Sequence, residues 1–273
     1  MPSERSNSSK SRVFIAMLSG LYRPFVRRAA RQVLQGRRID RSRPEAGRFL
    51  RTDVTAFLDD VWRKVPGILA GEDLDAIPTL GNKNNVFLAA VTIAAYQALL
   101  DAGIEREYAM ELFADVGWKL YELMAKAPLS VARLVRKDPQ RRVELVIHLL
   151  LRFPFSAPGR PGYEVKAWSK HDRIYTYWTY CAPLGFVRRY VEHHGDRGEI
   201  EAFYQSWCLY DWPLADILAG SKAGERNHYE RPHTLSRGDA VCDMCFHAAA
   251  GMSSDLRGQG HHESEMHAQE AHP

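Results

Sequence analysis

The chain has 273 residues, of which 45% are hydrophobic, so it can bury a sizeable core as one large domain or two small ones. No apolar run approaches the roughly 18 residues of a membrane-spanning helix, and four cysteines are too few for a disulfide framework. The N-terminus lacks the small-residue cleavage site of a secretory signal. We therefore expect a cytoplasmic protein with reduced thiols.

The net charge of +4 is unevenly distributed. Residues 1–51 hold 13 Lys or Arg against three Asp or Glu, whereas residues 52–273 hold 24 against 30. The basic character therefore belongs to an N-terminal extension. Because the acidic remainder would repel phosphate groups, we expect no nucleic-acid partner.

Within the extension, residues 13–34 show a helical pattern of apolar side chains flanked by arginines. A basic amphipathic helix of this kind can lie peripherally on an anionic membrane or in the acidic groove of a partner. It can equally pack on its own domain. The sequence leaves these alternatives open, and it does not set the oligomeric state.

Helical patterns then occupy the chain from Asp53 to about Phe153. We expect helices over 53–65, 85–102, 105–126 and 130–153, the last of them interrupted near Asp138. Prolines and glycines at 154–162 mark a change of character.

The second half mixes strands with helices. Residues 163–170 and 173–181 suit a hairpin, helices are expected over 184–194 and 199–218, and strands over 231–235 and 240–248. These elements predict an α+β fold: a helical N-terminal half packed with a small antiparallel sheet and helices in the C-terminal half. We expect a basic extension at 1–51, a single α+β domain at 52–250 and a disordered His-rich tail at 251–273.

The segment Trp207–Trp212 contains the most distinctive residues. On a continuous helix, Cys208 and Asp211 share a face because they are three positions apart. A thiol beside a carboxylate can serve as a nucleophile next to a proton carrier, or as two ligands of a metal. Free cysteine is also a common buried apolar residue, so a purely structural role is the alternative.

The pair Cys242 and Cys245 has the spacing of a zinc knuckle but lies in an expected strand. Residues three apart on a strand face opposite sides, so Cys242 shares a face with Met244 and Phe246, and Cys245 does not. We therefore expect no zinc knuckle and predict no cofactor. A thiol and a carboxylate still leave a divalent metal open.

Cysteine, aspartate and glycine residues follow one another in a recognisable order through the second half. In chain order these are Cys181, Cys208-x-x-Asp211, and Arg231-x-x-Thr234-Leu235-x-x-Gly238-Asp239-x-x-Cys242-Asp243. Upstream, a Pro78-x-x-Gly81-x-x-Asn84 turn leads into an alanine-rich helix. Over residues 55–250 this pattern resembles the L-2-amino-thiazoline-4-carboxylic acid hydrolase family.

The resemblance implies a hydrolase-like domain that opens a cyclic amidine or related C–N bond of a small-molecule substrate, as when a thiazoline opens toward N-carbamoyl-cysteine. By hypothesis Cys208 attacks or positions water, Asp211 carries the proton, and Cys181 and Cys242 complete the pocket. An ionised Asp211 would raise the pKa of the Cys208 thiol, so the hypothesis needs Asp211 protonated at the start or Cys208 as a ligand.

Three further residues are candidates for binding the substrate: Arg231, His233 and Asn84. Arg231 and His233 can anchor an anionic group, although Arg231 is also compatible with a surface strand. Asn84 and its neighbour Asn85 can supply amide contacts, although helix capping accounts for one of them.

Two other interpretations remain open. The order Trp-Cys-x-x-Asp before a Cys-bearing strand is similar to the organomercurial lyases, which use two thiols and a carboxylate, although the 34 residues from Cys208 to Cys242 depart from their spacing. The fold is also similar to small-molecule-binding domains of the vinyl-reductase-associated type. In that case the chain is a non-catalytic small-molecule or metal-binding sensor module.

Overall fold

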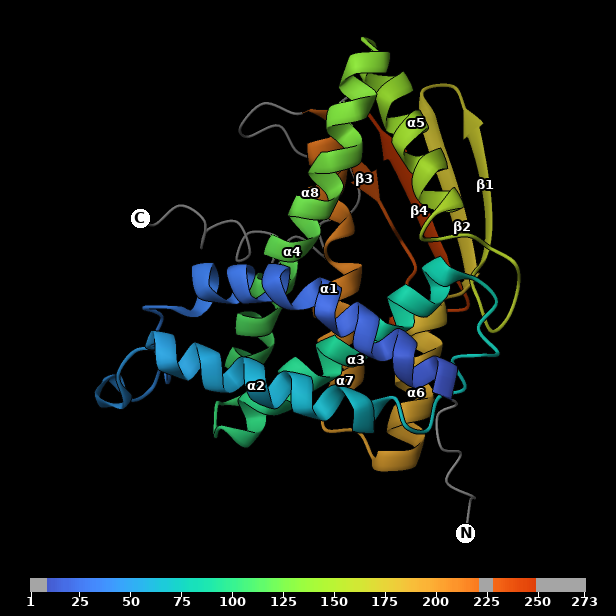
Figure 1. The fold of residues 1–273 in the computed structure, drawn as a ribbon. Helices are drawn as coiled ribbons and strands as arrows, with labels where there is room; N and C mark the ends of the chain where they lie inside the picture. The colour runs from blue at the N-terminus through green and yellow to red at the C-terminus, as the bar shows by residue number, and fades with distance from the viewer. Residues whose placement is uncertain (1–8, 221–227, 249–273) are drawn as a thin grey trace.

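The computed structural model describes residues 9–220 and 228–248, and its N-terminal half is helical (Figure 1). The helices of this half are α1 (Ser9–Leu34), η1 (Pro44–Ala46), α2 (Arg51–Ile68), α3 (Leu80–Asp101), α4 (Arg106–Val135) and α5 (Pro139–Arg152). The break expected near Asp138 is confirmed, because the Asp138 carboxylate caps α5 by accepting a hydrogen bond from the Arg141 amide at 2.8 Å. Helix α4 continues through Pro128, beyond the end expected at residue 126.

The second half adds a small sheet and further helices, so the predicted α+β class is confirmed. Its elements are β1 (Glu164–Lys170), β2 (Arg173–Tyr180), α6 (Ala182–His194), α7 (Glu199–Phe203), η2 (Tyr204–Cys208), α8 (Asp211–Ala219), β3 (Tyr229–Glu230), η3 (Leu235–Arg237) and β4 (Cys242–His247). The four strands are antiparallel in the order β1-β2-β4-β3. The hairpin expected around His171 is the β1–β2 pair.

The register of β2 against β4 sets which side chains face the helices. Trp178 pairs with Cys242, and Thr176 pairs with Met244. Thr176, Trp178 and Cys242 are buried, because this face of the sheet meets the helical layer. The alternation predicted for Cys242, Met244 and Phe246 is confirmed.

Strand β3 differs from the prediction. It comprises only Tyr229–Glu230, so Arg231 follows the strand and is not its first residue. The residues beyond Arg231 turn away from the sheet and form η3, whose first amide is held by the side chain of Cys242. The expected strand over 231–235 is therefore wrong.

Helix α1 is part of the main core. Its buried side chains Ile15, Leu18, Tyr22 and Val26 belong to the same hydrophobic cluster as α2, α3 and α4. The Tyr22 hydroxyl donates a hydrogen bond to Oδ1 of Asn84 at 2.8 Å. Residues 9–34 thus pack on their own domain and are not a detached extension.

The His-rich tail expected at 251–273 lies outside the described residues. Among the residues that the structure describes, no helix combines the length and apolarity needed to cross a membrane.

Candidate active site

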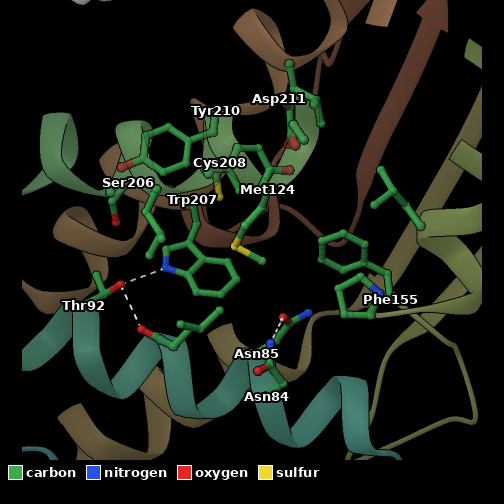
Figure 2. Close-up of a pocket in the computed structure, with 18 of the residues that line it drawn as sticks. Asn84, Asn85, Thr92, Met124, Phe155, Ser206, Trp207, Cys208, Tyr210 and Asp211 are labelled. Carbon is green, nitrogen blue, oxygen red and sulfur yellow. Dashed lines mark hydrogen bonds between the residues drawn. The ribbon is translucent and has the colours of Figure 1, made fainter. Parts of the chain in front are cut away.

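A cavity of about 730 Å³ lies between helices α1, α3, α4 and α5, the inner face of the sheet, and the η2–α8 segment. Its walls are mostly aliphatic and aromatic. A few polar side chains interrupt them, and these include Asn84, Asn85, Asp211 and Arg231. Figure 2 shows Cys208 and Asp211 on one side of the pocket, with Asn84 and Asn85 on a helix at the opposite side.

The junction of η2 and α8 positions the Cys-x-x-Asp segment. The single helix expected over 199–218 is wrong: a π-helical turn ends at Cys208, and α8 begins at Asp211. The Leu209 amide donates to the carbonyl of Tyr204, five residues back, at 3.2 Å. A π-turn changes the phase of a helix and is frequent at functional sites. Both Cys208 and Asp211 still line the cavity.

Arg231 and Asp211 form an ion pair at the cavity wall. The Arg231 side chain has an exposed fraction of 0%, and its Nη1 lies 2.9 Å from Asp211 Oδ2. The same nitrogen donates to the Cys208 carbonyl at 3.0 Å. The guanidinium also lies over the rings of Trp212 and Tyr229, 4.4 Å and 5.8 Å from their centroids. Aromatic faces attract a cation, so both rings stabilise the buried charge.

Two nitrogens of this guanidinium have no hydrogen-bond partner among the described residues. Nε and Nη2 of Arg231 are buried, and no described residue accepts a hydrogen bond from either. Buried donors are satisfied in most proteins, because an unsatisfied one loses its hydration without replacement. A planar guanidinium with free donors matches a carboxylate or phosphate group. An anionic group at this wall would therefore be a suitable partner for the guanidinium.

Asp211 has an unusual protonation equilibrium. Burial raises the pKa of its carboxyl group to about 6, an effect partly offset by Arg231 and by the hydrogen bond from Tyr229. The Tyr229 hydroxyl donates to Asp211 Oδ2 at 3.3 Å. A carboxyl group with a pKa near 6 exchanges protons close to neutral pH, as a general acid or base does.

Burial also raises the pKa values of the three cavity thiols, and this keeps them protonated at neutral pH. Burial raises the pKa of Cys208 although Arg231 and Ser236 oppose the shift, and burial raises the pKa of Cys242 to about 12. Burial also places the pKa of Cys181 well above its ordinary value. The Cys208 sulfur lies 3.2 Å from the Ser236 hydroxyl. All three groups are therefore neutral thiols at pH 7, whereas a nucleophile needs the thiolate.

A polar chain crosses the opposite wall. Tyr22 donates to Asn84, the Asn84 amide lies 3.5 Å from Oδ1 of Asn85, and Asn85 donates to the Tyr163 hydroxyl at 2.8 Å. Helix capping explains neither asparagine, because Thr79 caps α3 by accepting from the Asn82 amide. Helix α3 begins at Leu80, earlier than expected, and this places both asparagines inside the helix and against the cavity.

Six of the seven predicted site residues come together at this cavity. They are Asn84, Cys181, Cys208, Asp211, Arg231 and Cys242. Cys181 arrives by a different route from the one expected. It lies just after β2, as the residue before α6, and not within the strand expected over 173–181, and from there it lines the cavity.

His233 does not join them. Its side chain is 56% exposed, and its Nδ1 lies 2.7 Å from Oδ2 of Asp243. Its own amide donates to Oδ1 of the same aspartate, so the loop after Arg231 directs His233 outward. The hydrogen bond to Asp243 raises the pKa of His233. The prediction that His233 contacts the substrate in this pocket is wrong.

Several residues of the site were not anticipated from the sequence. Trp212 and Tyr229 cover the Arg231 guanidinium. Their positions gave a signal, because Trp212 directly follows Asp211 and Tyr229 lies two residues before Arg231. Tyr121 and Tyr163 line the cavity from α4 and from the segment before β1. Their positions carry no local signal that separates them from ordinary core aromatics.

The acidic, cysteine and histidine side chains of the described residues are dispersed. The described residues contain no group of three or more His, Cys, Asp or Glu side chains arranged to hold a metal ion. Cys245 lies outside the cavity, with its sulfur 3.8 Å from Arg173 Nη1. It therefore does not share a site with Cys242.

No family model, curated protein or solved structure matches this chain. The resemblance to the thiazoline hydrolase family therefore stays a prediction.

Proposed function

We propose that this protein binds an amphipathic small molecule, whose apolar body fills the cavity and whose anionic group contacts Arg231. One observation carries the proposal: a fully buried guanidinium, with two unpartnered nitrogens, lies on the wall of an otherwise apolar cavity. Keeping such a group dry is costly unless a ligand satisfies it.

The size and lining of the cavity indicate the apolar part of the ligand. A volume of about 730 Å³ falls within the range of sites that enclose drug-sized molecules. Aliphatic and aromatic side chains of α1, α3, α4 and α5 form most of the walls, including Leu18, Leu88 and Leu120. A small polar substrate would leave most of this surface without a partner.

The charge balance of the site indicates the polar part. An ionised Asp211 neutralises Arg231, whereas a protonated Asp211 leaves the guanidinium as an uncompensated cation. Because the pKa of Asp211 is about 6, both states are accessible near neutral pH. A monoanionic group that approaches Arg231 would therefore favour the protonated form of Asp211.

The binding proposal can be tested with two probes of equal chain length, laurate and dodecanol, in titrations followed by tryptophan fluorescence. Trp178 and Trp207 line the cavity and report its occupancy. We expect laurate to bind at least about tenfold more tightly than dodecanol, since hydrogen bonds to a charged group contribute about 1.5–3 kcal/mol. Equal affinities would contradict the role of Arg231.

Variants then assign the difference to one residue. Arg231→Met should abolish the preference for laurate, and Arg231→Lys should retain part of it. Arg237→Met is the matched control. Like Arg231, Arg237 pairs with a carboxylate and lies over a tyrosine ring, but it does not line the cavity. An Arg237→Met variant with the same loss would show that the effect is not specific.

Hydrolysis of a cyclic amidine or related C–N bond is the second candidate. It is supported by the meeting of Cys208, Asp211, Cys181 and Cys242 in one cavity and by the pKa of Asp211. The neutral state of the thiols favours Asp211 over Cys208 as the reactive group. The same thiols and carboxylate keep carbon–mercury cleavage as a third chemistry.

Turnover separates these candidates from simple binding. A panel of thiazolines, cyclic amidines, amides and phenylmercury acetate should be assayed with the wild type, Cys208→Ser and Asp211→Asn. A binding protein turns over none of them, and its Cys208→Ser variant keeps its affinity for laurate. Turnover that disappears in Asp211→Asn would establish an enzyme.

A further inference from the structure

The cavity opens to the surface through an apolar mouth. Six large hydrophobic residues that line it are also exposed: Met17, Leu21, Leu80, Met124, Leu149 and Phe153. Their exposed fractions lie between 40% and 59%. Met17 and Leu21 belong to α1, Met124 to α4 and Leu149 to α5. Leu80 is the first residue of α3, and Phe153 directly follows α5. In Figure 1, α1 crosses the lower half of the molecule and α4 and α5 rise above it.

The apolar surface extends beyond the mouth on two helices. On α1, Val13 and Phe25 continue the four-residue spacing of Met17 and Leu21, and they are 67% and 44% exposed. On α4, Val131 and Val135 follow Met124 by seven and eleven residues, so they share its face, and they are 60% and 58% exposed. We call these four residues and the six of the mouth the mouth surface. Exposed apolar residues gathered around the mouth of a cavity, and continued along the same helix faces, are candidates for an interaction site.

The mouth surface has a positive border. Helix α1 contains six Lys or Arg residues and no Asp or Glu. Lys10 and Arg28 lie seven residues before Met17 and seven after Leu21, so helical phase places them at the two ends of the α1 stripe. Arg152 adjoins Phe153. Among the described residues, no carboxylate forms an ion pair with Lys10, Arg28 or Arg152.

We infer that the mouth surface docks on an anionic lipid bilayer and that the ligand enters the cavity directly from the lipid. An apolar face bordered by cations is the pattern of an interfacial helix, whose apolar side enters the bilayer while its cations meet anionic headgroups. The inference rests on the proposed binding of an amphipathic ligand, because such a molecule partitions into membranes. It extends the predicted membrane contact of residues 13–34 to α4, α5 and the cavity.

Two other occupants fit the surface less well. A second copy of the chain, docked symmetrically, would bring two α1 helices with six cations each against one another. The segments at 1–8, 221–227 and 249–273 are also poor complements in composition, since their only large apolar residues are Met1, Met252, Leu256 and Met266. A bilayer that contains anionic lipids would bury the apolar residues and would also supply negative charges for the cations.

Vesicle flotation of the full chain tests the inference. We expect the wild type to bind vesicles of phosphatidylcholine with phosphatidylglycerol and to release them at high salt, and to bind pure phosphatidylcholine weakly. Lys10→Glu/Arg28→Glu should weaken binding at least about 25-fold, because each cation near an anionic surface contributes about fivefold. Phe25→Ser/Val131→Ser should weaken it about tenfold.

The control variant is Leu50→Ser/Trp168→Ser, which removes hydrophobic side chains that are 64% and 46% exposed but do not line the cavity or belong to the mouth surface. It should bind vesicles like the wild type. Phe25 and Val131 do not line the cavity either, so laurate affinity in lipid-free solution should stay unchanged in Phe25→Ser/Val131→Ser. This measurement separates a failure of docking from a failure of ligand binding.

Two results would overturn the inference. One is equal vesicle binding by the wild type and Phe25→Ser/Val131→Ser. The other is a wild type that stays off anionic vesicles and forms a dimer in light scattering that Phe25→Ser/Val131→Ser dissociates. That outcome would assign the mouth surface to self-association.

Discussion

The Nη1 atom of Arg231 lies 2.9 Å from Oδ2 of Asp211, inside a cavity whose remaining walls are largely apolar. A buried ion pair contributes little net stability, because its attraction is offset by the loss of hydration of both charges. Removing one partner is costly, since it leaves the other charge buried alone. The pair is therefore weak evidence for stability, and its place on the cavity wall is what the proposed ligand binding uses.

The first prediction concerns the energetics of this pair. Arg231→Met should lower the free energy of unfolding by about 3 kcal/mol, because Asp211 loses its cation. Arg231→Met/Asp211→Leu should recover most of that loss, since neither charge remains. Urea denaturation of the wild type, both single variants and the double variant gives the coupling energy. Additive effects would show that the two side chains do not interact.

The second prediction follows from the pKa of Asp211. Burial raises it from an ordinary 3.8 to about 6, so between these values the folded protein binds more protons than the unfolded chain. The contribution of Asp211 to stability is therefore present at low pH and is lost as pH rises from about 4 to about 6. A shift of about two units corresponds to about 3 kcal/mol.

Comparison with Asp211→Asn isolates this contribution. The difference in unfolding free energy, wild type minus variant, should fall across that pH window and level off above pH 7. A difference that does not change between pH 4 and pH 7 would mean that Asp211 titrates normally in the folded protein.

The third prediction concerns the thiols. Because burial raises the pKa of Cys208 and of Cys242, both should react with iodoacetamide at pH 7.5 more slowly than the same residues in urea-unfolded protein. The rate at Cys208 should still be rising at pH 9. Peptide mapping by mass spectrometry assigns each rate. Fast alkylation of Cys208 at neutral pH would show an activated thiolate and would favour the hydrolase.

The sequence predicted the fold class and most of the site because those features depend on local patterns. Alternation along 240–248 was enough to select Cys242 over Cys245, since residues three apart on a strand face opposite sides and only the face of Cys242, Met244 and Phe246 lines the cavity. The break at Asp138 was visible because a capping aspartate precedes a proline. Arg231 was chosen from the sequence and does line the cavity, although its burial was not foreseen, and its role as an anchor stays a prediction.

The remaining features depend on contacts between distant segments. The π-turn before Leu209 has no local sequence signal, and it replaces the expected continuous helix. His233 was misplaced because its direction is set by Asp243, ten residues away on β4. The cavity itself requires several helices and a sheet to leave one volume unfilled, and no pattern along one segment encodes that.

The fourth prediction tests the size of the ligand. Ala95 lines the cavity from α3, so Ala95→Phe should fill part of the volume without disturbing the surrounding packing. Laurate affinity, measured by calorimetry, should fall about tenfold, because about two methylene groups lose their place at about 0.8 kcal/mol each. Hexanoate should bind the variant as it binds the wild type, since its short chain leaves that part of the cavity empty.

Ala102→Phe, at the exposed end of α3, is the control and should change neither affinity. If Ala95→Phe kept full affinity for laurate, the apolar chain would not occupy this part of the cavity, and the proposed placement of the ligand would be wrong.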